Sequence, residues 1–123
     1  NYPMSAETYN NRGITYSKKG RYDLAISDFT KSLEIKPDAK TYYNRGVTYA
    51  IKGQYNLALS DLKRCIELDP MNKAAYDIRG SILAGLACSD WENACRLGNC
   101  NHLNEGVKIG LCIDTTGNNP ELE

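Results

Sequence analysis

The sequence predicts an all-α fold, a right-handed superhelical array of antiparallel helix pairs, and three observations lead to it. The segment Tyr9–Pro37 repeats as Tyr42–Pro70, with identical residues at 15 of 29 positions when the two are compared at an offset of 33. Apolar residues in both copies recur at the three- and four-residue steps of a helix. Each copy also has a glycine near its middle and a proline at its end. A period between about 20 and 50 residues is typical of arrays in which each unit buries its apolar face against the next.

Capping and helix-breaking residues predict where each helix begins and ends. Ser5 is the expected N-cap of the first helix, and Asp38 and Asn72 stand at the equivalent places of the later units. Gly20 and Gly53 are expected to end the first helix of each pair, because glycine adopts the left-handed conformation that a helix end requires. The helices expected in the two complete units are 6–18, 22–35, 39–51 and 55–68.

The third unit is shortened. Its first helix is expected from Lys73 to about Ala84, but only seven residues separate Gly80 from Ala87, where twelve separate Gly13 from Ala25. Two outcomes are open: a tight turn at Gly85 that keeps a short hairpin, or one rod from Lys73 to about Leu97. The glycine at position 85 favours the tight turn.

We expect a single domain over residues 1–123, made of these units and a tail. The units cover about 6–38, 39–72 and 73–98. Residues 99–114 are expected to form a capping tail over the last apolar face, which such arrays need for solubility. Residues 115–123 are expected to be disordered.

Three glycines lie inside first helices, at positions 13, 46 and 80. An interior glycine costs about 1 kcal/mol relative to alanine, so its recurrence in one chain needs a reason. We expect the paired helix to cross there so closely that no Cβ fits. Ala25, Ala58 and Ala87 are the matching small residues expected on the second helices.

These residues resemble the tetratricopeptide repeat, whose pattern has small, aromatic and proline residues at these spacings. Tyr9 and Arg12 depart from the tryptophan and leucine that the pattern favours early in the first helix, as do Tyr42 and Arg45 in the second copy. The resemblance covers about residues 5–97. The repeat residues that carry it, all expected to be structural, are Gly13, Tyr16, Ala25, Phe29, Pro37, Gly46, Tyr49, Ala58, Leu62, Pro70, Gly80, Ala87 and Trp91.

Composition argues against a nucleic-acid or membrane partner. Fifteen basic and fifteen acidic residues give a formal net charge of zero, so no basic field attracts nucleic acid. The longest apolar stretch, Gly80–Ser89, is too short to span a bilayer. The chain begins at Asn1 without a signal-peptide pattern, so a cytoplasmic and an exported location, including a bacterial periplasm, both stay open.

Catalytic groups are sparse, and we expect neither an enzyme nor a cofactor. His102 is the single histidine, and no nucleophile, phosphate-loop or paired-histidine motif occurs. Asp28, Asp61 and Asp90 recur at one position of the second helices, which we expect to face outward as solvated or ion-paired groups.

Five cysteines raise the question of metal or disulfide chemistry in the tail. Cys95, Cys100, His102 and Cys112 could supply zinc ligands, but their spacing is not that of a usual zinc motif, so we expect no metal. Cys65 lies at a small-residue packing position. The segment 94–112 resembles the closing segment of bacterial tetratricopeptide proteins, and this resemblance implies a Cys100–Cys112 disulfide if the protein is exported.

The resemblance implies that the first helices line a concave groove that binds a peptide segment of another protein. Ile14 and Val47 replace the asparagines of the carboxylate clamp found in chaperone-binding members, so we expect no binding to a chaperone's acidic C-terminus. Two alternatives remain: a metal-binding or thiol-redox module in the cysteine tail, and self-assembly through a fused rod, so both a monomer and a swapped dimer are open. The expected groove residues are Glu7, Asn10, Ile14, Ser17, Lys40, Tyr43, Val47, Ala50, Ala74, Asp77 and Ser81.

Overall fold

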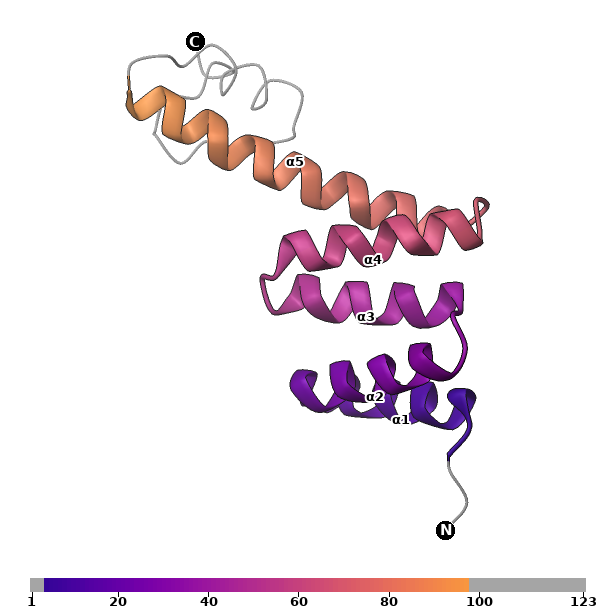
Figure 1. The fold of residues 1–123 in the computed structure, drawn as a ribbon. Coiled ribbons are helices and arrows are strands. Elements are labelled where there is room, and N and C mark those ends of the chain that lie inside the picture. Colours follow the sequence, from indigo (N-terminus) through magenta and orange to yellow (C-terminus); the bar gives the residue numbers. More distant parts are fainter. Residues whose placement is uncertain (1–3, 98–123) are drawn as a thin grey trace. The chain divides into compact units, whose positions relative to one another are not determined.

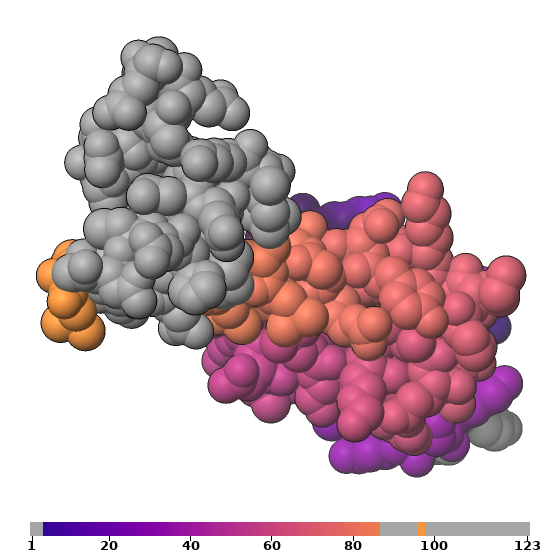
Figure 2. All heavy atoms as spheres, turned by 90° about the horizontal axis from the view of Figure 1, so that it is seen from above, coloured from indigo at the N-terminus to yellow at the C-terminus, as the bar shows by residue number. Residues whose placement is uncertain are grey.

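The computed structural model describes residues 4–97, and within that range the side chains of 87–95 are not described (coloured part of Figure 2). The described residues form helices and no strand. The helices are α1 (Ala6–Lys18), α2 (Tyr22–Ile35), α3 (Ala39–Ile51), α4 (Tyr55–Leu68) and α5 (Lys73–Arg96) (Figure 1). The predicted all-α class is confirmed, and α1 to α4 have the bounds expected from the sequence.

The chain divides into two compact units, Asn1–Arg79 and Gly80–Glu123. In the first unit α1 packs on α2 and α3 packs on α4, which gives two helical hairpins. Helix α2 also packs against α3, and α1 contacts α3, so the second hairpin stacks on the first. This is how an array of repeats buries a continuous core.

Capping groups fix the helix ends. The Ser5 side chain accepts a hydrogen bond from the Thr8 backbone N–H at 3.1 Å, and Asn72 Oδ1 accepts one from the Ala75 N–H at 3.1 Å. Asp38 stands at the N-cap position of α3, but its side chain makes no capping bond. Gly20 and Gly53 have φ angles of 77° and 79°. This is the left-handed conformation that glycine adopts readily just after the end of a helix, so these residues terminate α1 and α3.

Two of the three helix-interior glycines lie where another helix crosses. A Cβ on Gly13 would lie 2.6 Å from Phe29 Cε1, and one on Gly46 would lie 3.2 Å from Asp61 Cβ. The close crossing expected at these positions is therefore present. At Gly80 the expectation was wrong, since no described atom lies within 4 Å of a Cβ there. The physical reason is that α5 does not fold back, so no second helix of the same hairpin covers this glycine.

A Gly13→Ala variant should lose about 1 kcal/mol of unfolding free energy. The alanine gains about 1 kcal/mol of helix propensity, but displacing the buried Phe29 ring costs about 1–3 kcal/mol. Urea denaturation of Gly13→Ala, Phe29→Leu and the double variant measures the coupling. Leucine already stands at the matching position of the second repeat, Leu62, so Gly13→Ala should be tolerated better in the Phe29→Leu background. Equal effects of Gly13→Ala in both backgrounds would contradict the steric account.

Both complete hairpins contain a buried carboxylate paired with an arginine of the other helix. Arg12 Nε and Nη2 donate to Asp28 at 2.6 and 2.8 Å, and Arg45 Nε and Nη2 donate to Asp61 at 2.8 and 2.7 Å. The outward, solvated position expected for these aspartates was wrong, because only 2% of Asp28 and 4% of Asp61 is exposed. The ion-pair alternative is the one observed. Asp90 lies outside the residues whose side chains are described.

Each of these arginines also lies between two tyrosine rings of its own helix. The Arg45 guanidinium carbon is 5.8 Å from the ring centroids of both Tyr42 and Tyr49, and Arg12 has the same relation to Tyr9 and Tyr16. The hydrogen bonds to Asp61 raise the pKa of Arg45, with burial acting in the opposite direction. Arg45 Nη1 donates a further bond to Thr30 of the first hairpin at 3.2 Å. The pair therefore joins neighbouring repeats as well as the two helices of one repeat.

The tight turn expected at Gly85 is absent, because α5 continues as one helix from Lys73 to Arg96 (Figure 1). Gly85 does not have a positive φ, unlike Gly20 and Gly53. Those two glycines follow a lysine and precede a polar residue, whereas Gly85 lies between Ala84 and Leu86, which favour helix. Without the five deleted residues, nothing in the sequence interrupts the helix. The capping tail 99–114, the disordered end 115–123 and the Cys100–Cys112 pair lie outside the described residues.

Cys65 occupies the small-residue packing position expected for it. Its side chain is fully buried and free, and its Sγ accepts a hydrogen bond from Asn72 Nδ2 at 3.4 Å. Burial raises the pKa of the Cys65 thiol, so the neutral form is retained inside the fold.

Candidate functional site

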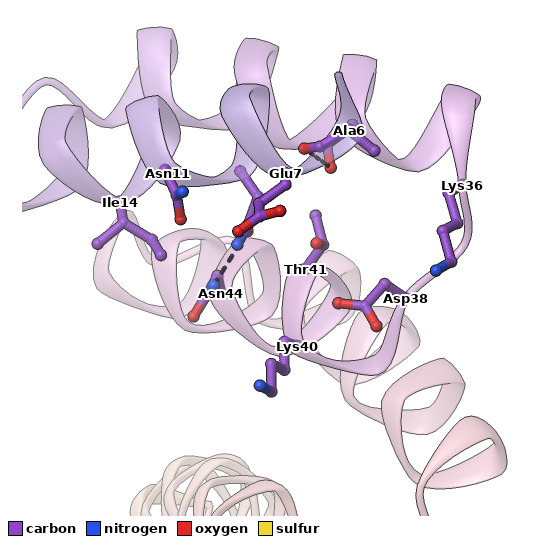
Figure 3. Close-up of a pocket in the computed structure, with 11 residues that line it drawn as sticks. Ala6, Glu7, Asn11, Ile14, Lys36, Asp38, Lys40, Thr41 and Asn44 are labelled. Atoms are coloured by element: carbon purple, nitrogen blue, oxygen red, sulfur yellow. Dashed lines mark hydrogen bonds between the residues drawn. The ribbon is translucent and has the colours of Figure 1, made fainter.

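A pocket of about 500 Å³ lies within the first unit, between α1, the α2–α3 connection and α3 (Figure 3). Glu7, Asn11 and Ile14 reach it from α1, while Thr41 and Asn44 reach it from α3. It therefore lies where the first helices of two successive repeats face each other, which is where helical arrays present their binding surfaces.

Side-chain amides are the most distinctive groups of this pocket. Asn10, Asn11 and Asn44 all line it, and Asn44 Nδ2 donates to Asn10 Oδ1 at 3.1 Å. Among the described residues the exposed Asn11 side chain makes no hydrogen bond. An amide side chain offers both a donor and an acceptor, the same pair that a peptide backbone offers.

The charged groups of the pocket balance. Glu7 and Asp38 are acidic, and Lys36 and Lys40 are basic. All four side chains are labelled in Figure 3, where Lys36 and Asp38 lie on the α2–α3 connection. The pocket therefore presents no net field of either sign. A ligand that carries one kind of charge gains little from it.

A smaller pocket of about 120 Å³ lies next to the first and shares Ile14 and Asn44 with it. Its apolar lining includes Val47, Tyr43 and Phe29, and Ser17 and Thr48 also line it. Ser17 and Thr48 hydroxyls lie 3.4 Å apart, one from each repeat. An apolar depression beside a polar pocket suits an apolar side chain on an extended chain.

Seven of the residues expected in the groove line one or both pockets. Glu7, Asn10, Ile14 and Lys40 line the larger one, and Ile14, Ser17, Tyr43 and Val47 line the smaller one. Ala50, Ala74, Asp77 and Ser81 line neither. That any of these eleven residues belongs to a binding site remains a prediction.

Sequence reasoning missed several lining residues, above all Asn11 and Asn44. These two asparagines stand at matching positions of the repeats, which was a signal that could have found them. They were missed because the groove face was taken as one narrow row of each helix. The pocket is wider, since α3 and the chain before it contribute Lys36, Asp38 and Thr41.

The described residues contain no group of three His, Cys, Asp or Glu side chains placed to hold a metal ion. Of the four residues considered as zinc ligands, Cys100, His102 and Cys112 lie outside that range, and the side chain of Cys95 is not described. In the same part of the chain, no helix has both the length and the apolarity needed to cross a membrane.

A model of the tetratricopeptide repeat matches residues 6–38 and 39–72, which together make up more than half of the chain. The chain belongs to the tetratricopeptide repeat family. Members of this family are interaction modules, built from helix pairs that stack into extended binding surfaces. Among curated protein sequences, none matches this one closely enough to count as a relative.

The solved structures similar to this chain include the first tetratricopeptide domain of Spaghetti (RPAP3), bound to the HSP90 peptide SRMEEVD. The two share 28% sequence identity over 85% of this chain and 92% of the other, with a TM-score of 0.63. The likeness supports the assignment of the fold and of the family.

Proposed function

We propose that this tetratricopeptide protein is an interaction scaffold that binds an extended peptide segment of a partner protein in the groove between α1 and α3. The observation that carries the proposal is the larger pocket, which is about 500 Å³ and is lined by three side-chain amides from two repeats. Support also comes from the similar structure, which holds a peptide of another protein.

The lining predicts the kind of peptide. The amides of Asn11 and Asn44 can pair with backbone N–H and C=O groups of an extended segment, which gives affinity without selecting a sequence. The apolar surface of Ile14, Val47 and Tyr43 can take one aliphatic or aromatic side chain. Because the four charged lining residues balance, the segment should be near neutral or carry both signs of charge.

A strongly acidic peptide should not bind well. The peptide SRMEEVD carries three acidic side chains and one arginine. The two lysines of the larger pocket are matched by two acidic residues, and Ile14 adds an apolar group at its edge. We therefore expect weak binding of acidic peptides for two reasons: Ile14 replaces an asparagine of the carboxylate clamp, and the charged residues that line the larger pocket sum to zero.

Selection from a displayed library of random peptides, followed by fluorescence anisotropy, tests the proposal. We expect selected peptides to bind wild type, and Asn11→Ala to weaken them by about tenfold, since a lost hydrogen bond contributes about 1–1.5 kcal/mol. The matched control is Asn56→Ala on α4, an exposed asparagine outside both pockets, which should bind as wild type does.

Labelled SRMEEVD serves as the charge control and should show no saturable binding. Equal weakening by Asn11→Ala and Asn56→Ala would place the site elsewhere. Tight binding of SRMEEVD, reduced by Asn11→Ala, would keep the groove but overturn the predicted peptide chemistry.

A further inference from the structure

The smaller pocket of the first unit has a lining that cannot easily change shape. Ile14 of α1 and Val47 of α3 stand at matching positions of the two repeats. Both are β-branched, and such side chains keep one strongly preferred rotamer in a helix. Phe29 is 1% exposed, and its ring packs against Gly13, where a Cβ would lie 2.6 Å from Cε1. The pocket is therefore preformed, and a ligand must fit the space that is present.

The hydroxyl groups that line this pocket are bonded within the protein itself. Thr48 is 1% exposed, and its Oγ1 donates to the Asn44 backbone carbonyl at 2.8 Å. A hydroxyl has one hydrogen, so in the 3.4 Å contact between Ser17 Oγ and Thr48 Oγ1 the serine is the donor. Neither hydroxyl has a hydrogen left for a ligand. A polar side chain that entered the pocket would therefore lose its water without gaining a donor from these two residues.

Lys18 is the one charged residue among the described residues that line the smaller pocket. It lies in the last turn of α1 and is exposed. Within the described part of the chain it makes no ion pair. A basic side chain of a ligand would therefore meet an uncompensated like charge, whereas an uncharged side chain would not.

The volume of the smaller pocket separates aliphatic from aromatic side chains. This volume is about 120 Å³. An apolar cavity of about 150 Å³ is large enough to hold benzene, so the smaller pocket falls short of a phenyl ring. Valine, isoleucine and leucine have smaller, branched side chains whose methyl groups can pack against Ile14, Val47 and Phe29.

We propose that the smaller pocket is the specificity-determining subsite of the groove, that it takes one branched aliphatic side chain of the bound peptide, and that Val47 sets the upper limit on the size of that side chain. This inference rests on the proposed peptide binding. Asn44 lines both pockets, so a peptide whose backbone pairs with the Asn44 amide presents a neighbouring side chain to the smaller pocket. Because side chains of an extended segment alternate between its two faces, one position of the peptide enters the pocket and the positions on either side do not.

A series of peptides tests the proposal. A peptide selected on wild type is synthesised with its most enriched apolar residue replaced in turn by alanine, valine, leucine, phenylalanine and lysine, and fluorescence anisotropy gives each dissociation constant. We expect valine or leucine to bind best. The alanine, phenylalanine and lysine peptides should bind about tenfold more weakly, since one methylene group too many or too few in an apolar pocket is worth about tenfold or more.

Two variants of Val47 change the size of the pocket in opposite directions. Val47→Ala removes two methyl groups, so the phenylalanine peptide should bind it about tenfold more tightly than it binds wild type. Val47→Ile adds one methyl group and keeps the β-branch, so the leucine peptide should bind about tenfold more weakly while the alanine peptide is unchanged. Ile51→Ala is the matched control, because Ile51 is on the same helix, is 55% exposed and lines neither pocket. It should keep the wild-type order of affinities.

Failure of the subsite and failure of the groove give different results. Peptides that bind and are weakened by Asn11→Ala, yet keep one order of affinities on wild type and on both Val47 variants, would overturn the subsite alone. So would a phenylalanine peptide that binds wild type as tightly as the leucine peptide does. If no peptide binds wild type, the groove and the subsite are both wrong. Circular dichroism checks the fold of each variant, and the conservative Val47→Ile decides the matter if Val47→Ala unfolds.

Discussion

Replacing Asp61 by alanine should lower the unfolding free energy by about 3–5 kcal/mol, the range found when one partner of a buried ion pair is removed. Asp61 is 4% exposed and accepts two hydrogen bonds from Arg45. Without it, Arg45 keeps a charge that is largely shielded from water, since only 19% of its side chain is exposed. The same arginine also bonds Thr30, so the loss should reach the contact between the repeats.

Asp23→Ala is the matched control for this prediction. Asp23 also pairs with a basic residue, Lys52, but 84% of its side chain is exposed. A pair so well solvated contributes about 0–1 kcal/mol. Urea denaturation followed by circular dichroism measures both variants. Comparable losses of unfolding free energy from Asp23→Ala and Asp61→Ala would contradict the claim that burial gives the Arg45–Asp61 pair its larger contribution to stability.

Phe29→Ala should also lower the unfolding free energy by about 3–5 kcal/mol, because it removes a large buried ring and leaves a cavity. Phe29 is 1% exposed and packs directly over Gly13, where no side chain can move in to fill the space. Ile35→Ala is the control, since 55% of Ile35 is exposed on the same helix.

The control should change the unfolding free energy by about 0.5 kcal/mol or less, as is usual for surface positions. Denaturation of the two variants under identical conditions gives the comparison. A Phe29→Ala loss below about 1 kcal/mol would mean that the first hairpin does not depend on this contact.

The regular part of the fold could be predicted from the sequence because each of its features occurs twice. Gly20 and Gly53, for example, follow first helices of equal length, and both adopt the left-handed conformation that a helix end needs. A pattern that occurs twice shows which residues mark the helix ends, which a single copy does not. The bounds of α1 to α4 could therefore be predicted.

The third unit could not be settled from its sequence in the same way. Gly85 is compatible with a turn, with a helix interior and with a close crossing, and propensity alone does not choose among them. The observed helix reflects the neighbouring alanine and leucine residues, which favour helix more than one glycine opposes it.

The buried aspartates were misplaced for a different reason. A carboxylate is usually exposed, and that general tendency was applied to Asp28 and Asp61 one residue at a time. The arginines recur with them at a constant spacing of sixteen residues, from Arg12 to Asp28 and from Arg45 to Asp61. Opposite charges that recur together are a better guide to burial than either charge alone. The candidate pocket was predicted only in part, because the chain before α3 and residues beside the expected rows of α1 and α3, such as Asn11 and Asn44, also line it.

The central claim is that the face shared by α1 and α3 binds a peptide. Titrating a selected peptide into isotope-labelled protein and following the backbone amide chemical shifts tests it most directly. We expect the largest changes within residues 7–14 of α1 and 40–47 of α3, with little change near Leu24 and Leu57, which are exposed on α2 and α4. Largest changes on α2 and α4, with α1 and α3 unaffected, would contradict it.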